Sequence, residues 1–229
     1  MSTAEYESPR ASAQELRASF LDCLIAPDAR GARIVIDDSL AAGTSAASLY
    51  LDVIGPAMSD VGRLWELAKI SVAQEHLATQ ITQSVIATLG LHLRAEMAVG
   101  HGRVAVVAST PGERHSLGGQ MVADFLEAQG WTTLALGPDA PLTDLVGFAR
   151  DQRAELVALS TALARNLLLV TRTCGLLRRL DPPPMIVVGG QAYGGNAEQA
   201  LAVGADAFAD GPAALLDLLA VRFAPDAAD

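Results

Sequence analysis

The second half of the chain alternates short apolar runs with helical segments, and this alternation limits the possible folds more than any other feature. Apolar strands are expected at 103–109, 131–136, 155–160, 185–188 and 207–209, with helices at 117–129, 142–150, 166–180, 198–203 and 212–222. Strands that are apolar on both faces are typical of a parallel sheet covered by helices on both sides. We therefore predict an α/β, flavodoxin-like (Rossmann-type) doubly wound parallel sheet. A ligand should bind beyond the C-terminal ends of its strands.

The first half of the chain shows only helical periodicity. Apolar residues recur at three- and four-residue steps from near Ser12, and the later helices are expected at 30–42, 45–67 and 71–93, with irregularities at Pro56 and Gly62. Four helices with short connections predict a four-helix bundle. We therefore expect a bundle domain over 12–95, a linker over 95–102 and an α/β domain over 102–229.

The start of the fourth helix can be placed closely. Ser71 and Gln74 have the spacing of a capping box, in which the side chains of the N-cap and third helical residues bond each other's backbone N–H groups. This assigns Trp65 to the end of the third helix. Glu75 and His76 then fall in the first turns of the fourth.

The loop after the first strand carries the strongest chemical signal in the α/β half. It contains Glu113, His115 and Gly118 in a Glu-x-His-x-x-Gly spacing. A histidine that binds a metal needs its other ring nitrogen oriented by an acceptor, often a carboxylate. Gly118 has no side chain, so a bulky group can approach the start of the helix. A solvated surface histidine, or a phosphate bound at this loop, would explain single parts of the pattern equally well.

The overall charge and the missing motifs exclude several classes. A net charge of −10, with no Lys/Arg cluster beyond Arg178-Arg179, disfavours direct binding to DNA. We find no signal peptide, no apolar run long enough to span a membrane and no zinc-type Cys/His set. The dinucleotide fingerprint and the nucleophile elbow are missing too. We therefore expect a cytoplasmic protein.

The loop over Glu113 to Gly118 resembles the Asp-x-His-x-x-Gly signature of cobalamin-binding domains, with Glu113 in place of Asp. The resemblance implies that His115 is the lower axial ligand of cobalt. It also implies that the nucleotide tail of the cofactor runs past a serine motif and a Gly-Gly pair at later strand ends. Ser160 and Gly189-Gly190 match these two features. The family usually reads Ser-x-Leu, whereas this chain reads Ser-Thr-Ala-Leu over 160–163, so the contacts of the tail stay open.

The helical half resembles the Trp-x9-Glu-His motif of CarH/LitR-type adenosylcobalamin photoreceptors through Trp65, Glu75 and His76. In that family a four-helix bundle caps the upper face of the cofactor. The resemblance implies that Trp65 packs on the adenosyl group, that Glu75 hydrogen-bonds near it and that Val72 lines the same pocket. It further implies that His76 is a possible upper cobalt ligand after photolysis.

Together the two resemblances imply that the cofactor is cobalamin, with adenosylcobalamin as its expected form. The residues expected to contact it are Trp65, Val72, Glu75, His76, Glu113, Arg114, His115, Gly118, Ser160, Thr161, Gly189 and Gly190. Simpler explanations exist for some of them: Trp65 as a core residue, Glu75 as an acid at a helix N-terminus, and His76 as an interior histidine with its polar atoms satisfied.

These resemblances imply a cobalamin-dependent sensor or regulator that is not an enzyme and that responds to light. The bundle begins near Ser12, which leaves no room for an N-terminal DNA-binding domain, so we expect the signal to pass through a protein partner or through homo-oligomer state. The main alternative is a corrinoid methyl carrier of a methyltransferase system. A cobalamin adaptor and the small subunit of a radical mutase are weaker alternatives.

Overall fold

The computed structural model describes residues 11–95 and 99–223. The chain divides into two compact units, the first ending at His92 and the second beginning at Leu93. The predicted linker over 95–102 includes residues 96–98, and the predicted second domain includes 224–229; both segments lie outside the described residues. No helix in the described part of the chain is long and apolar enough to cross a membrane.

The first unit is entirely helical where it is described. Its elements are α1 (Ala13–Ile25), α2 (Ala29–Ala41), α3 (Ala46–Ser48), the π-helical η1 (Leu49–Ile54), α4 (Gly55–Glu66) and α5 (Val72–Ala95), whose last three residues belong to the second unit. Because α3, η1 and α4 follow one another without a break, they form the single long helix expected at 45–67. The four helices predicted for this half are confirmed.

An irregular stretch inside the long helix prepares the backbone for Pro56. The Gly55 N–H bonds the carbonyl of Tyr50, five residues back, which is π-helical pairing. Proline has no N–H to continue an α-helical ladder, so it is tolerated where the pairing already departs from that ladder. The expected irregularity at Gly62 is wrong. Gly62 lies inside the regular α4. The helix tolerates it, since an interior glycine costs only about 1 kcal/mol relative to alanine.

The predicted capping box at the start of α5 is confirmed. The backbone N–H of Ser71 donates to Oε1 of Gln74 over 2.9 Å, and the backbone N–H of Gln74 donates to Oγ of Ser71 over 3.3 Å. This fixes the first turn of α5, which carries Glu75. Trp65 lies at the end of α4, as predicted.

The second unit is a five-stranded parallel sheet in the order β2-β1-β3-β4-β5. The strands are β1 (Val104–Ser109), β2 (Thr132–Gly137), β3 (Leu156–Ser160), β4 (Met185–Gly189) and β5 (Ala207–Phe208), each within one residue of its predicted ends. The helical segments are α6 (Leu117–Ala128), α7 (Leu142–Asp151), η2 (Ala164–Asn166), α8 (Leu167–Leu177), η3 (Gln191–Tyr193), α9 (Ala197–Ala202) and α10 (Pro212–Arg222). The predicted flavodoxin-like sheet is confirmed.

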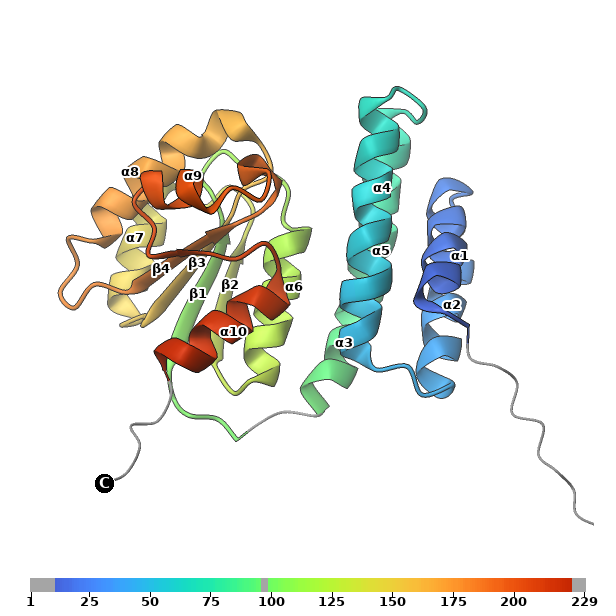
Figure 1. The fold of residues 1–229 in the computed structure, drawn as a ribbon, viewed down its shortest axis with the longest axis horizontal. Helices are drawn as coiled ribbons and strands as arrows, with labels where there is room; N and C mark the ends of the chain where they lie inside the picture. The colour runs from blue at the N-terminus through green and yellow to red at the C-terminus, as the bar shows by residue number, and fades with distance from the viewer. Residues whose placement is uncertain (1–10, 96–98, 224–229) are drawn as a thin grey trace, which may run out of the picture. The chain divides into compact units, whose positions relative to one another are not determined.

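Helices cover both faces of the sheet (Figure 1), and alternate residues of β1 bury against opposite helical layers. In β1, Ala105 and Val107 pack with α6 and α10, whereas Val106 and Ala108 pack with α7, α8 and α9. Successive side chains of a strand point to opposite faces, so a sheet covered on both sides needs apolar residues at every position. This is why the strands read as continuous apolar runs.

Three strands end side by side, and their ends position the loops that follow. Ser109 at the end of β1 pairs with Ser160 of β3, which pairs in turn with Gly189 of β4. The loops that carry Glu113, Thr161 and Gly190 therefore leave the same edge of the sheet.

Candidate functional site

The loop between β1 and α6 is organised around the buried carboxylate of Glu113. The side chain of Glu113 has no exposed surface. Its Oε1 accepts hydrogen bonds from the backbone N–H groups of Arg114 (3.1 Å) and His115 (3.2 Å) and also contacts Nδ1 of His115. Oγ of Ser109 donates to the carbonyl of His115 over 2.9 Å, which ties the loop back to its strand.

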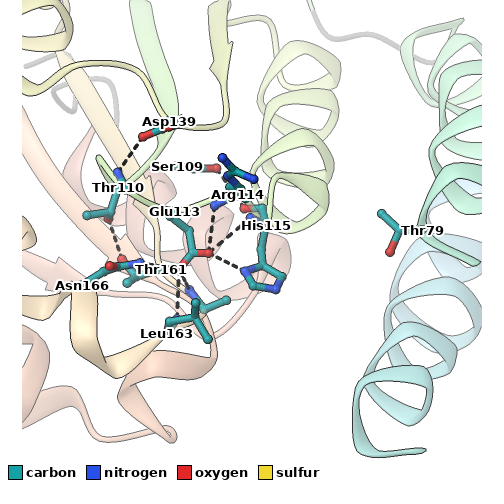
Figure 2. Close-up of polar contacts among 12 residues, drawn as sticks. Thr79, Ser109, Thr110, Glu113, Arg114, His115, Asp139, Thr161, Leu163 and Asn166 are labelled. Carbon is teal, nitrogen blue, oxygen red and sulfur yellow. Dashed lines mark hydrogen bonds and ion pairs between the residues drawn. The ribbon is translucent and has the colours of Figure 1, made fainter. Parts of the chain in front are cut away.

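The other oxygen of Glu113 belongs to a second loop, the one that follows β3. Oε2 accepts from the backbone N–H groups of Ala162 (3.1 Å) and Leu163 (3.0 Å) and from Nδ2 of Asn166 (3.0 Å). Figure 2 shows these contacts converging on the carboxylate from both loops. One side chain therefore joins the loop after β1 to the loop after β3.

These contacts decide the ionisation of Glu113. Burial by itself raises the pKa of the carboxyl group, but hydrogen bonds from His115, Leu163 and Asn166 outweigh burial and hold the pKa below its ordinary value. Glu113 is therefore an anion with its hydrogen-bonding capacity filled. A buried charge is tolerated when it is paired and hydrogen-bonded in this way.

His115 is oriented by this anion and remains accessible. Its Nδ1 is held by Glu113, and its side chain is 56% exposed. No residue in the described ranges bonds its Nε2, which is thus the ring nitrogen open to a ligand. The predicted contact between Glu113 and His115 is confirmed, and the role of His115 toward cobalt stays a prediction. Arg114 is exposed beside it.

Asp139, in the loop after β2, supports the same loop from another direction. Its Oδ1 accepts from the backbone N–H of Gly112 over 2.9 Å, and its own N–H donates to the carbonyl of Glu113 over 3.0 Å. Asp139 adopts a left-handed conformation with φ of 55° to do so. Such a conformation is uncommon for a residue with a side chain, and aspartate tolerates it better than most.

At the start of α6, Gly118 is exposed and lies close to the end of β3. A Cβ on Gly118 would lie 3.4 Å from Oγ of Ser160. The strand end and the helix start thus face each other without an intervening side chain. Together with a histidine whose Nε2 is open, these residues fit a planar ring that carries a metal, as expected for cobalamin.

The glycines after β4 have a different explanation. A Cβ on Gly189 would lie 2.3 Å from the carbonyl oxygen of Ala209, and one on Gly190 would lie 2.3 Å from that of Thr161. Packing within the protein therefore already requires both glycines. Thr161 is fully buried, and its Oγ1 is 2.7 Å from Oγ1 of Thr110. Contacts of Thr161, Gly189 and Gly190 with the cofactor stay predictions.

The helical unit contains a second glutamate–histidine pair. Oε2 of Glu75 lies 2.5 Å from Nδ1 of His76, and Oε1 of Glu75 accepts from Oγ1 of Thr79 over 3.0 Å. The side chain of His76 is 73% exposed. Trp65 and Val72 are 46% and 52% exposed, so neither is a core residue of the bundle.

Three residues that hold the two glutamate–histidine arrangements were not among the predicted site residues: Thr79, Asp139 and Asn166. Thr79 could have been identified, because it is four residues after Glu75 and faces it on a helix. Asn166 and Asp139 act from loops that follow other strands, and no local spacing predicts such contacts.

Comparison with known proteins identifies the same cofactor for both units. A family model described as a B12 binding domain matches residues 103–219, just over half of the chain, and a second B12 binding domain model matches residues 16–89. The chain is 32% identical over 187 residues to the HTH-type transcriptional repressor CarH of Myxococcus xanthus. That match covers 81% of this chain and 61% of the relative, so the chain corresponds to only part of the repressor's length.

Corrinoid proteins are also similar to this chain. Trimethylamine corrinoid protein 1 of Methanosarcina acetivorans is 23% identical over 69% of this chain and 73% of its own length. The solved monomethylamine corrinoid protein of Methanosarcina barkeri superposes with a TM-score of 0.80 at 23% identity, covering 92% of this chain and all of that one. With both units matched by B12 binding models, the chain belongs to the B12-binding domain family and is a cobalamin-binding protein.

Proposed function

We propose that the protein is a cobalamin-dependent sensor that is not an enzyme, that uses adenosylcobalamin and that responds to light. The observation that carries this proposal is the exposed Glu75–His76 pair on the helical unit. Glu75 engages Nδ1 of His76, as Glu113 engages Nδ1 of His115, so each unit presents one histidine with Nε2 open. Two such histidines suit a cofactor whose metal is bound from both faces in one of its states.

In this proposal the α/β domain predicted over 102–229 would bind the cofactor from below. His115 would hold cobalt through Nε2, and Glu113 would fix its tautomer and ring orientation. Gly118 and Ser160 provide the surface that the ring approaches. Arg114, Thr161, Gly189 and Gly190 complete the expected contacts.

The helical bundle domain predicted over 12–95 would surround the upper ligand of the cofactor. Trp65 and Val72 supply an apolar surface that excludes water, and Glu75 supplies a carboxylate that Thr79 also holds. When bound, adenosylcobalamin supplies a cobalt–carbon bond that light breaks. His76, whose Nδ1 is held by Glu75, is the residue that would hold cobalt once that bond is broken. The intact cofactor thereby stabilises one of two arrangements of the protein, which is the requirement for a switch.

The signal leaves through a protein partner or through a change in homo-oligomer state. The similarity to a transcriptional repressor supports a regulatory role. The acidic net charge of −10 disfavours direct binding of this chain to DNA. A cytoplasmic location suits such a role.

A methyl carrier is the second candidate function. The observation in its favour is the similarity to methylamine corrinoid proteins, one of which aligns over all of its own length with 92% of this chain. A carrier must open its upper face to partner enzymes. An upper histidine held in place by a carboxylate does not serve that purpose.

The test is illumination of the protein with adenosylcobalamin, followed by absorption spectroscopy and size-exclusion chromatography of dark and illuminated samples. A sensor should convert to a stable product with nitrogen ligands on both faces and should change its oligomeric state or its affinity for a partner. A carrier would keep the cofactor without a light-driven change in the protein, and this result would reject the proposal.

A further inference from the structure

We propose that the outward face of α8 binds an acidic amphipathic helix of a partner protein. This inference rests on the proposed function in one respect, the passage of the signal to a protein partner. The face consists of Arg165, Leu168, Arg172, Gly175 and Arg179, all of them exposed. These residues are three or four positions apart along η2, α8 and the turn that follows, so they lie on one side of the helix. We call them the α8 arginine face.

The opposite side of α8 holds the helix on the sheet. Val170, Cys174 and Leu177 are fully buried within the helical layer that α8 forms with α7 and α9 (Figure 1). A helix that covers a sheet in this way normally turns polar residues toward solvent. Leu168 departs from that rule, because it is 63% exposed. The fold gains little from a leucine at this position, whereas an apolar contact on a partner would bury it.

The charge of the α8 arginine face is opposite to that of the whole chain. Between Glu155 and Asp181 the sequence has four arginines and no acidic residue, whereas the net charge of the chain is −10. The other α-helices that follow β1, which are α6, α7, α9 and α10, each carry at least one acidic residue. A local reversal of charge attracts a partner of the opposite sign and fixes its orientation.

Only one of these four arginines forms an ion pair in the part of the chain that the structure describes. Arg178 donates from Nε to the carbonyl of Gly204 over 2.8 Å, and its Nη2 lies 2.7 Å from Oδ1 of Asp206. Within residues 11–95 and 99–223, no carboxylate forms an ion pair with the three arginines of the α8 arginine face. The neighbours Arg178 and Arg179 therefore differ in use: the first stabilises the fold, and the second is open to a partner.

The spacing of the arginines indicates what binds them. Arg165 and Arg172 are seven residues apart, as are Arg172 and Arg179, so each pair is separated by about 10 Å along the helix axis. Carboxylates seven residues apart on a second helix repeat at the same distance, and arginine binds a carboxylate through two parallel hydrogen bonds. An apolar residue between two such acids would cover Leu168. A phosphate backbone offers no apolar group there, so the leucine favours an acidic helix over a nucleic acid.

The test is titration of a fluorescein-labelled helical peptide with the full chain, loaded with cobalamin in the dark. The peptide is rich in alanine and glutamine, with glutamate at every seventh position and a leucine between the first two glutamates. A control peptide has glutamine in place of each glutamate. Fluorescence anisotropy should show that the wild type binds the glutamate peptide in preference to the control peptide, and that this binding weakens as the salt concentration rises.

Two double variants of the protein locate the binding surface. Arg165→Glu combined with Arg172→Glu should lower the affinity for the glutamate peptide at least about tenfold, because two attractive charge pairs become repulsive. Arg150→Glu combined with Arg153→Glu makes the same change in net charge at two exposed arginines near the end of α7. That matched control should bind the peptide as the wild type does.

Equal binding of the two peptides by the wild type, or equal affinity of the two double variants, would overturn the proposal. Tighter binding of a labelled DNA duplex, lost on reversal of Arg165 and Arg172, would assign the face to nucleic acid and also overturn it. So would a changed oligomeric state of that variant with unchanged peptide binding, because the face would then belong to a second copy of the chain.

Absorption spectra of the same samples before and after illumination report the proposed function separately. A light-driven change in the spectrum without peptide binding rejects only the role of the α8 arginine face. Peptide binding without any light-driven change rejects only the response to light. The two failures are thus distinguishable.

Discussion

Glu113 is completely buried and holds Nδ1 of His115, whose side chain is more than half exposed. A buried, fully bonded anion thus orients an accessible imidazole from two residues away. The carboxylate is fixed from the loop after β3, so the direction of the imidazole depends on how two strand ends pack. This coupling gives the account its clearest consequences.

Replacing Glu113 by Gln should destabilise the apoprotein by about 3 kcal/mol. In the wild type, both oxygens of Glu113 accept hydrogen bonds from N–H groups. In either orientation of the Gln amide, its NH2 group replaces one of these oxygens, so that a donor faces donors. The measurement is urea denaturation without cofactor. Glu155→Gln is the control, because Glu155 is partly exposed and only pairs with Arg103 at 3.5 Å. Equal stability of the two variants would contradict the saturated environment of Glu113.

The two tryptophans should respond in opposite ways to substitution by alanine. Trp65 is 46% exposed, so Trp65→Ala should change the free energy of unfolding by less than about 1 kcal/mol but weaken binding of adenosylcobalamin. Trp131 is 6% exposed and packs edge-on against His101 and Phe223, so Trp131→Ala should cost about 3–5 kcal/mol. Thermal denaturation and equilibrium dialysis separate the two effects. Unchanged cofactor affinity in Trp65→Ala would remove it from the upper pocket.

His76→Ala should leave dark binding intact and abolish the nitrogen ligand that forms on the upper face after illumination. Thr79→Val should have a weaker effect of the same kind, because Glu75 loses the donor that holds its Oε1. The absorption spectrum after illumination tests both variants. Thr171→Val, which removes an exposed hydroxyl that bonds only a backbone carbonyl of α8, is the control. An unchanged illuminated product in His76→Ala would eliminate the proposed upper ligand.

The buried thiol of Cys174 should make the protein less stable in alkali. Burial raises the pKa of Cys174 from 9.0 to about 11. Between these two values the unfolded chain has lost the thiol proton while the folded chain retains it, so the free energy of unfolding falls as pH rises. Denaturation of the wild type and Cys174→Ala at several pH values tests this. The variant should lose less stability across the window, and identical slopes would contradict the shifted pKa.

Sequence patterns predicted most of the fold because each element is determined locally. The strands of the sheet bury both faces, so β3 and β4 could be identified as apolar runs, and the Ser71–Gln74 capping box located the start of α5. The helical periodicity did not show whether Trp65 is exposed or buried, since a tryptophan at the end of an amphipathic helix can be either. The π-helical turn before Pro56 was visible only as an irregularity.

The candidate site was only half predictable, for a physical reason. The contact of Glu113 with His115 spans two residues of one loop and follows from spacing. The bond from Asn166 spans 53 residues and exists only because β1 and β3 are neighbours in the sheet. Strand order brings such residues together, and no motif in the sequence records it.

The dark absorption spectrum of adenosylcobalamin bound to the wild type, His115→Ala and His92→Ala tests the central claim most directly. His92 is exposed and has no place in the proposed site, so His92→Ala controls for the loss of a histidine. The account predicts a histidine-coordinated spectrum for the wild type and His92→Ala, and weaker binding or an uncoordinated spectrum for His115→Ala. The same affinity and the same spectrum in all three proteins would contradict it.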